Sequence, residues 1–149
     1  MCQRLGSLLV LLQFGLLACL SVLAAAAWSR GTAALASGLL AAASVLLGGW
    51  ALWHNRLGNF NIHPAPKPEG VLVMRGPYRL MRHPMYSAVL LAAAALASRA
   101  GGELGWLLWT GLFGVLLIKA RLEESWLRQH HPAYANYCKS CKRFVPWVF

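Results

Sequence analysis

Long apolar runs alternate with short polar segments along this chain of 149 residues. Leu5–Trp28 contains no charged residue over 24 positions, and Thr32–Trp53 contains none over 22. Each run is long enough to cross a hydrocarbon core of roughly 30 Å as a helix. Tyr86–Ser98 and Leu104–Ile118 are shorter, at 13 and 15 residues, and span only with helical polar flanks or in a locally thinned bilayer. The pattern predicts an all-α integral membrane bundle of about four transmembrane helices.

The polar connection 55–84 differs from the apolar runs because prolines and glycines interrupt it, which excludes one continuous helix. Residues 71–74 have an extended pattern, and Gly76-Pro77 indicates a turn. Pro84 suits the first turn of a helix, where the missing N–H costs nothing. We therefore expect the third helix to begin near His83–Pro84 and to run to about Ser98.

Gly101-Gly102 predicts a tight turn that leads into the fourth helix near Leu104. After Ile118 no glycine or proline occurs before Pro132, so residues 104–129 should form one helix of about 39 Å at 1.5 Å per residue. The resulting hairpin makes residues 82–86 neighbours of Glu123-Glu124 by topology alone.

The two adjacent glutamates should not both face the interior of this hairpin. Neighbouring helical residues point about 100° apart, so at most one of them is expected to face inward. Lys119 lies one turn before Glu123 and shares its face, whereas Arg121 pairs better with Glu124. We expect Glu123 to face the site and Glu124 to face away.

The net charge of +10 is unevenly distributed rather than spread over a basic face, which argues against a nucleic-acid partner. With four spans, twelve of the fourteen Lys and Arg residues fall on one side of the membrane, and only Arg30 and Arg99 fall on the other. The positive-inside rule then places both termini and the 55–84 connection in the cytosol. Attraction to anionic headgroups is a second consequence.

Cys138-x-x-Cys141 is half of a zinc site at best, although His130 and His131 lie close enough in sequence to complete one. Unligated thiols in a reducing compartment are the preferred interpretation, and we assign no metal.

The polar residues at the hairpin base offer a carboxylate, a cation, an imidazole and two phenols, Tyr78 and Tyr86. A carboxylate binds an amino group or a ribose hydroxyl, and aromatic rings stack on a purine or a sulfonium. This inventory suits an adenosyl amino-acid cofactor. No G-x-G-x-x-G or P-loop pattern occurs. The structural alternative is that these charges are ion-paired or snorkelling residues that fix a helix end.

Three motifs occur in order: Gly76-Pro-Tyr-x-x-x-Arg-His-Pro-Met-Tyr86, Glu123-Glu-x-x-Leu127, and Tyr134-x-x-Tyr137 followed by Val145-Pro146. As a set they resemble the isoprenylcysteine carboxyl methyltransferase family of membrane methyltransferases, over about residues 55–149. The Arg-His-Pro-x-Tyr element alone recurs in phosphatidylethanolamine N-methyltransferases and in NADPH-dependent steroid and sterol reductases.

The resemblance implies S-adenosylmethionine bound at the cytosolic edge and a tunnel open to lipid for a hydrophobic acceptor. The implied cofactor contacts are Gly70, Val71, Leu72, Val73, Tyr78, His83, Pro84, Met85, Tyr86 and Glu123, with His63 as a further polar contact. The family's basic residue that faces the acceptor carboxylate aligns with Lys119, where arginine is usual, and Arg121 is the alternative. Two other departures are Ala88, where glycine is frequent, and His130-His131, which replaces a Phe/Gly-type turn.

The sequence thus predicts one membrane methyltransferase domain over 1–149, with 5–54 as scaffold helices and 55–149 as the cofactor- and substrate-binding part. Its expected partners are a lipophilic or lipidated acceptor, such as an isoprenylcysteine carboxylate or a related thiol or amine, and membrane lipids. Two alternatives stay open: an NADPH-dependent membrane reductase, and a non-catalytic membrane protein on the same scaffold. The sequence does not determine the acceptor or the oligomeric state.

Overall fold

The computed structural model describes residues 2–28, 33–55 and 72–147. This part of the chain is helical, and its only β-type pairing is an isolated bridge between Met81 and Lys142. The elements are α1 (Cys2–Ala26), α2 (Ala34–His54), the 3-10 helix η3 (Gly76–Arg79), α3 (Pro84–Ala100), α4 (Gly102–His130) and α5 (Tyr134–Ser140). The expected all-α class is confirmed.

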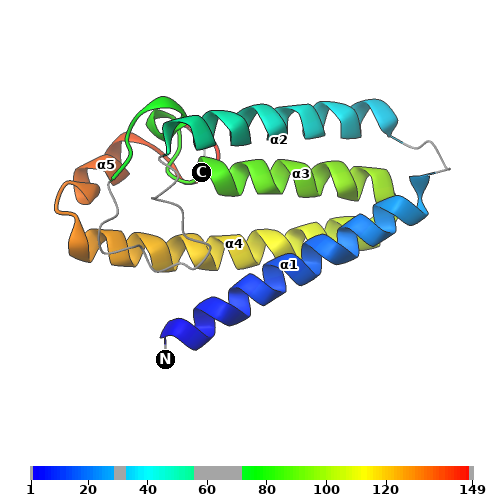
Figure 1. Cartoon of the computed structure of the whole chain (residues 1–149), viewed down its shortest axis with the longest axis horizontal. Coiled ribbons are helices and arrows are strands. Elements are labelled where there is room, and N and C mark those ends of the chain that lie inside the picture. Colours follow the sequence, from blue (N-terminus) through cyan, green and yellow to red (C-terminus); the bar gives the residue numbers. More distant parts are fainter. Residues whose placement is uncertain (1, 29–32, 56–71, 148–149) are drawn as a thin grey trace.

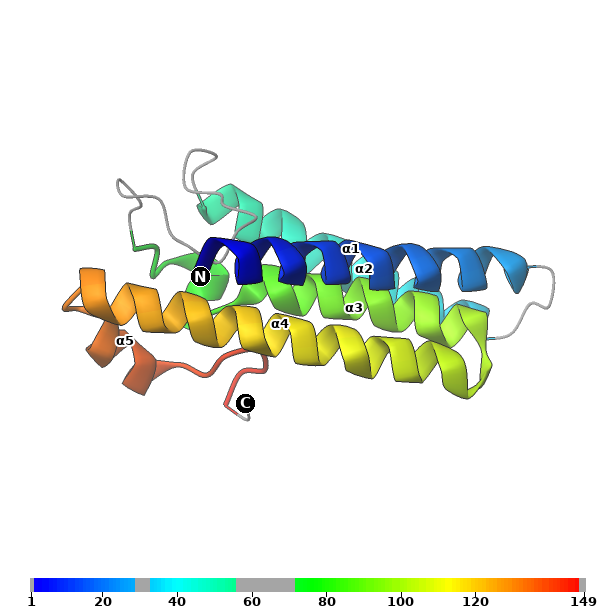
Figure 2. The same cartoon turned by 90° about the horizontal axis from the view of Figure 1, so that it is seen from below.

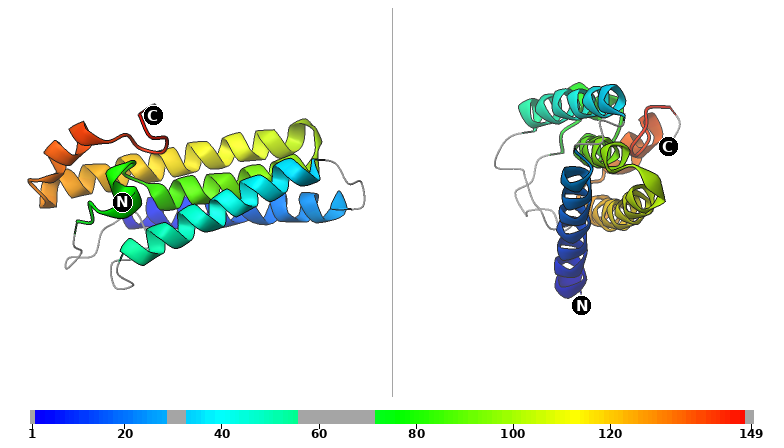
Figure 3. Two further views of the ribbon diagram at one scale, coloured as in Figure 1. Left: turned by 90° about the horizontal axis from the view of Figure 1, so that it is seen from above. Right: turned by 90° about the vertical axis from the view of Figure 1, so that its right-hand side faces the viewer.

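Helices α1 to α4 run side by side in alternating directions, and η3 and α5 lie together at one end of the bundle (Figure 1). The end-on view in Figure 3 places α3 between α2 on one side and the α1–α4 pair on the other. Helix α3 accordingly packs against all three other long helices. Small side chains permit this close packing, because Ala93 and Ala97 on α3 are fully buried. Ser44 on α2 adds a polar contact by donating to the carbonyl of Ala88 at 2.7 Å.

The bundle presents an apolar exterior. Helices α1, α2 and α4 are long and apolar enough to cross a membrane, and α3 is a shorter apolar helix of 17 residues. Large side chains such as Leu39, Val45 and Leu46 on α2 are exposed, while Leu20, Leu112 and Leu116 form part of the buried core. An apolar exterior of this extent matches lipid rather than water. The protein is therefore a membrane helical bundle.

The expected helix boundaries are close to the observed ones. Helix α3 begins at Pro84, as predicted, and ends two residues later than Ser98. Helix α4 begins two residues before Leu104. Gly101 and Gly102 both have positive φ, at 67° and 78°, so the chain reverses within these two glycines and α4 starts at once.

Ten of the fourteen Lys and Arg residues belong to the described part of the chain and lie at or near the end of the bundle that carries η3 and α5. They are Arg4, Arg75, Arg79, Arg82, Lys119, Arg121, Arg128, Lys139, Lys142 and Arg143. Arg99 lies at the opposite end, where it donates to the Trp28 carbonyl at 3.0 Å and covers the Trp28 ring. This asymmetry underlies the predicted cytosolic position of the η3–α5 end.

We therefore predict opposite exposure of two surface positions in intact cells. Glu103→Cys at the start of α4 should react with a membrane-impermeant maleimide, whereas Lys139→Cys in α5 should react only after permeabilisation. The parent protein is the matched control, since its own cysteines lie in α1 or at the end expected to be cytosolic. Labelling of Lys139→Cys in intact cells would contradict the orientation.

Candidate active site

The base of α3 is tied to the C-terminal segment that follows α5. The backbone N–H of Arg82 donates to the Lys142 carbonyl at 2.8 Å, and that of His83 donates to the Arg143 carbonyl at 3.0 Å. One turn into α3, Ser87 Oγ donates to the Phe144 carbonyl at 2.7 Å. Figure 2 shows this segment returning alongside α4 after α5. The C-terminal residues 141–144 thus form one wall of the region where α3 and α4 meet.

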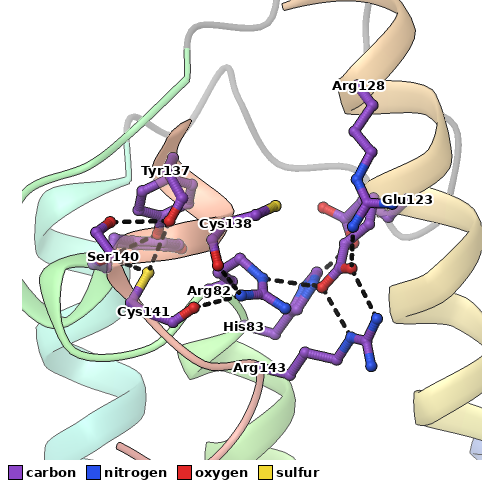
Figure 4. Close-up of polar contacts among 11 residues, drawn as sticks. Arg82, His83, Glu123, Arg128, Tyr137, Cys138, Ser140, Cys141 and Arg143 are labelled. Carbon is purple, nitrogen blue, oxygen red and sulfur yellow. Dashed lines mark hydrogen bonds and ion pairs between the residues drawn. The ribbon is translucent and has the colours of Figure 1, made fainter. Parts of the chain in front are cut away.

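Glu124 is the centre of this region and is almost fully buried, with 2% of its side chain exposed. Arg82 Nε donates to Oε1 at 3.0 Å, and Arg143 binds both carboxylate oxygens at 3.0 Å each. His83 Nε2 lies 3.3 Å from Oε1, and Arg128 Nη2 lies 3.6 Å from Oε2. In Figure 4 these four side chains converge from the start of α3, from α4 and from the C-terminal segment. Such charge-assisted contacts hold the start of α3, α4 and the C-terminal segment in fixed positions relative to one another.

Arg82 also binds the start of the C-terminal segment directly. Its Nη1 donates to the carbonyls of Cys138, at 3.2 Å, and of Cys141 (Figure 4). One guanidinium therefore links Glu124 on α4 to the end of α5. Because its Nε and Nη1 both donate to the protein itself, Arg82 acts as a structural cation that links these elements.

The expectation that Glu124 faces away from the site and pairs with Arg121 is wrong. Glu124 is buried and bound by other cations, while Arg121 is exposed. The physical reason is that the C-terminal segment covers a second side of the α4 end and brings Arg143 to Glu124. The imidazole of His83 also reaches both glutamates, with Nδ1 3.7 Å from Glu123 Oε2. A 100° separation on the helix therefore does not force one glutamate outward.

Glu123 remains partly open, with 33% of its side chain exposed. Tyr86 Oη donates to Glu123 Oε2 at 3.0 Å, and the Tyr86 ring stacks on His83 with 5.3 Å between centroids. The ammonium of Lys119 lies 5.5 Å from the centroid of the same tyrosine ring. A carboxylate, two stacked rings and a cation therefore meet here, as the hairpin topology predicts.

Tyr78 brings a second phenol to this cluster from η3. Burial and the charge of the Glu123 carboxylate raise the pKa of Tyr78 to about 12, and a side-chain hydrogen bond with Asn55 acts in the opposite direction. Tyr78 therefore remains a neutral hydroxyl at physiological pH. Its carbonyl accepts from Tyr137 Oη at 2.6 Å, which anchors η3 on α5.

The other residues predicted to contact the cofactor differ in their burial and packing. Leu72 packs against the Tyr134–Tyr137 cluster, and Val73 and Met85 are half-buried. Pro84 is fully buried at the first turn of α3, so it shapes the helix start. Gly70, Val71 and His63 lie outside the residues that the structure describes.

The Cys138-x-x-Cys141 pair belongs to the packing of α5. Cys141 Sγ lies within hydrogen-bonding distance of the carbonyls of Tyr78 and Tyr137, at 3.8 and 3.7 Å. His130 stacks on Trp126, with 4.4 Å between ring centroids. Within residues 2–28, 33–55 and 72–147, no three His, Cys, Asp or Glu side chains gather in an arrangement that holds a metal ion.

Sequence reasoning missed two residues of this region, Arg143 and Gln13. Arg143 lies two positions before the Val145-Pro146 motif. Its closeness to this motif is the one feature of the sequence that indicates a position near the site. Gln13 accepts from Lys119 Nζ at 2.6 Å, across 106 positions of sequence. Gln13 is an uncharged polar residue within the apolar run Leu5–Trp28, and nothing in its local sequence identifies Lys119 as its partner.

Comparison with known proteins gave one match. The family model described as phospholipid methyltransferase matches residues 32–133, which is well over half of the chain. The matched range includes α2, η3, α3 and α4, but neither α1 nor the C-terminal segment. Searches of the curated proteins and of the solved structures found no match.

We predict that Glu124 is required for stability. Glu124→Gln removes the charge that compensates Arg82 and Arg143, and breaking a buried pair of this kind should cost about 3–5 kcal/mol of unfolding free energy. The measurement is denaturant unfolding in detergent followed by tryptophan fluorescence. Glu103→Gln, an exposed acid at the far end of α4, is the matched control and should cost less than about 1 kcal/mol. Equal, small effects of the two changes would refute this role of Glu124.

Proposed function

Because the chain belongs to the phospholipid methyltransferase family, we propose that it transfers a methyl group from S-adenosylmethionine to a lipophilic acceptor at the edge of the membrane. Membership confirms, at the level of the family, the resemblance to membrane methyltransferases drawn from the motifs. The main observation in support of the proposal is the partial exposure of Glu123 and its contact with Tyr86. Glu123 is a half-open carboxylate that Tyr86 holds in place, beside the aromatic rings that a sulfonium cofactor requires.

The residues present suit the cofactor. Only Oε2 of Glu123 has a described protein donor, Tyr86, which leaves Oε1 for the amino group or ribose hydroxyls of a ligand. Leu72 and Val73 lie outside any helix or strand, so secondary structure does not occupy their backbone groups. S-adenosylmethionine supplies an activated methyl group on a sulfonium. The chain's own part is to bind this ligand between Glu123 and the 72–78 segment.

Lys119 is the better candidate for holding the acceptor. It is buried one turn deeper in α4 than Glu123, toward the side from which a hydrophobic molecule arrives, while Arg121 is exposed. No carboxylate of the described residues lies within ion-pair distance of its ammonium. The ammonium can therefore bind an anion that comes with the acceptor, such as the carboxylate of an isoprenylcysteine-like compound.

The chemical demand on the protein is small in this proposal. A carboxylate or thiolate acceptor is already nucleophilic, so transfer needs alignment with the methyl group and exclusion of water rather than a strong base. Glu124 and its cations hold α3, α4 and the C-terminal segment in register, and Glu123, Tyr86 and Lys119 are carried on that frame.

We predict that Glu123→Gln weakens binding of S-adenosylhomocysteine, because a hydrogen bond to a charged group is lost. The expected loss is about 1.5–3 kcal/mol, which is roughly ten- to a hundredfold in affinity. Calorimetry of the purified protein in detergent is the measurement. Arg121→Met, an exposed change on the same helix, is the control and should bind like the parent.

The same titration tests the alternative ligand. The parent should bind S-adenosylmethionine and S-adenosylhomocysteine in preference to NADPH, since Arg82 and Arg143 are committed to Glu124 instead of being open to a 2′-phosphate. Tight NADPH binding without S-adenosylhomocysteine binding would overturn the proposed function in favour of a reductase. Unchanged affinity in Glu123→Gln would remove Glu123 from the cofactor site.

A further inference from the structure

Helix α1 lies outside the part of the chain that the family model matches, yet it contributes a polar side chain to the site. Gln13 sits in the middle of this apolar helix and is buried, with 8% of its surface exposed. Its amide oxygen accepts from Lys119 Nζ at 2.6 Å. A buried polar group that loses its hydrogen-bond partner costs free energy. The short hydrogen bond between Gln13 and Lys119 therefore fixes the relative position of these two side chains on different helices.

The packing of α1 on α4 supports a fixed contact at this depth. Helix α1 crosses α4 obliquely in Figure 1, and the two helices are in contact. A Cβ added at Gly111 on α4 would lie 3.8 Å from Leu16 on α1, so the two helices meet closely one turn beyond Gln13. Leu20, the next turn along α1, is fully buried in the core. Gln13 therefore lies on the side of α1 that packs against α4.

Lys119 is held by partners that carry no charge. Among the residues that the structure describes, the partners of its ammonium are the Gln13 amide and the face of the Tyr86 ring. An amide oxygen satisfies one N–H donor without cancelling the positive charge, whereas a carboxylate at the same place would cancel it. The same Tyr86 donates its hydroxyl to Glu123. A continuous chain of contacts therefore runs from Gln13 through Lys119 and Tyr86 to Glu123.

We propose that Gln13 is a positioning and specificity residue of the acceptor site. It holds the Lys119 ammonium over Tyr86 without forming an ion pair with it, so that the site selects acceptors with an anionic group beside the atom that is methylated. This inference rests on the proposed function, and it gives α1 a part in the site in addition to its expected role as scaffold.

Two substitutions of Gln13 test the proposal. Gln13→Glu keeps a hydrogen-bond acceptor for Lys119 but adds the cancelling charge, and Gln13→Leu removes the acceptor at similar size. Ser21→Ala is the matched control on the same helix, because the Ser21 hydroxyl is exposed and bonds only within α1, to the Leu17 carbonyl. The probes are N-acetyl-S-farnesylcysteine and its carboxamide, which differ in charge alone, and binding is measured at equilibrium by tryptophan fluorescence.

The parent and Ser21→Ala should bind the acid at least about tenfold more tightly than the amide, as expected for a charge-assisted contact. In Gln13→Glu this preference should fall to near unity, and in Gln13→Leu the affinity for the acid should fall about tenfold. Affinity for S-adenosylhomocysteine should stay within about twofold in all of them, because the contacts of Glu123 are unchanged. In a Lys119→Met background, Gln13→Leu should have no further effect on acid binding.

A purely structural Gln13 would give a different pattern. Glutamate would then hold Lys119 at least as well as glutamine does, so Gln13→Glu would keep the acid preference and overturn the proposal. Equal affinity of the parent for acid and amide would overturn it as well, while binding of S-adenosylhomocysteine would leave the proposed function standing. A parent that fails to bind S-adenosylhomocysteine but shows the charge preference and its loss in Gln13→Glu would refute the proposed function and support the role of Gln13.

Discussion

The burial of one carboxylate, that of Glu124, is the constraint on which the arrangement of this site depends. A charge that is 98% removed from solvent has to be compensated by nearby cations. Helix α4 alone supplies only Arg128, at 3.6 Å, so the remaining partners have to come from elsewhere. Arg82 and His83 bring the base of α3, and Arg143 brings the C-terminal segment. The contacts of the Glu124 carboxylate therefore join α4, the base of α3 and the C-terminal segment. Apolar packing alone would fix the relative positions of these three parts less firmly.

The neighbouring glutamate has the opposite character. Glu123 shares the imidazole of His83 with Glu124, but it keeps a third of its side chain exposed and has one described donor, Tyr86. In the proposed function, the two adjacent glutamates therefore have different roles, one in stability and one in ligand binding. A fully compensated carboxylate is stabilising and unavailable to a ligand, whereas a partly compensated one is available and contributes less to stability.

The sequence predicts the fold well because membrane helices follow from simple rules. Apolar length, Pro84 at a helix start and the Gly101-Gly102 turn locate α3 and α4 within about two residues, and the hairpin they form predicts that His83 and Tyr86 meet Glu123. The failures share a physical cause. Glu124, Arg143 and Gln13 obtain their environment from segments far away in sequence, and helix periodicity says nothing about what another segment places against a given face.

The return of the C-terminal segment to the base of α3 also has a consequence for biosynthesis. Residues 141–144 are synthesised after all four long helices, and yet they supply the carbonyls that pair with Arg82 and His83 and the guanidinium that binds Glu124. Until they dock, Glu124 lacks its bidentate partner, and the start of α3 lacks the backbone acceptors on that side. The site is therefore complete only once this last-made segment has docked, and its completion depends on contacts between distant parts of the chain.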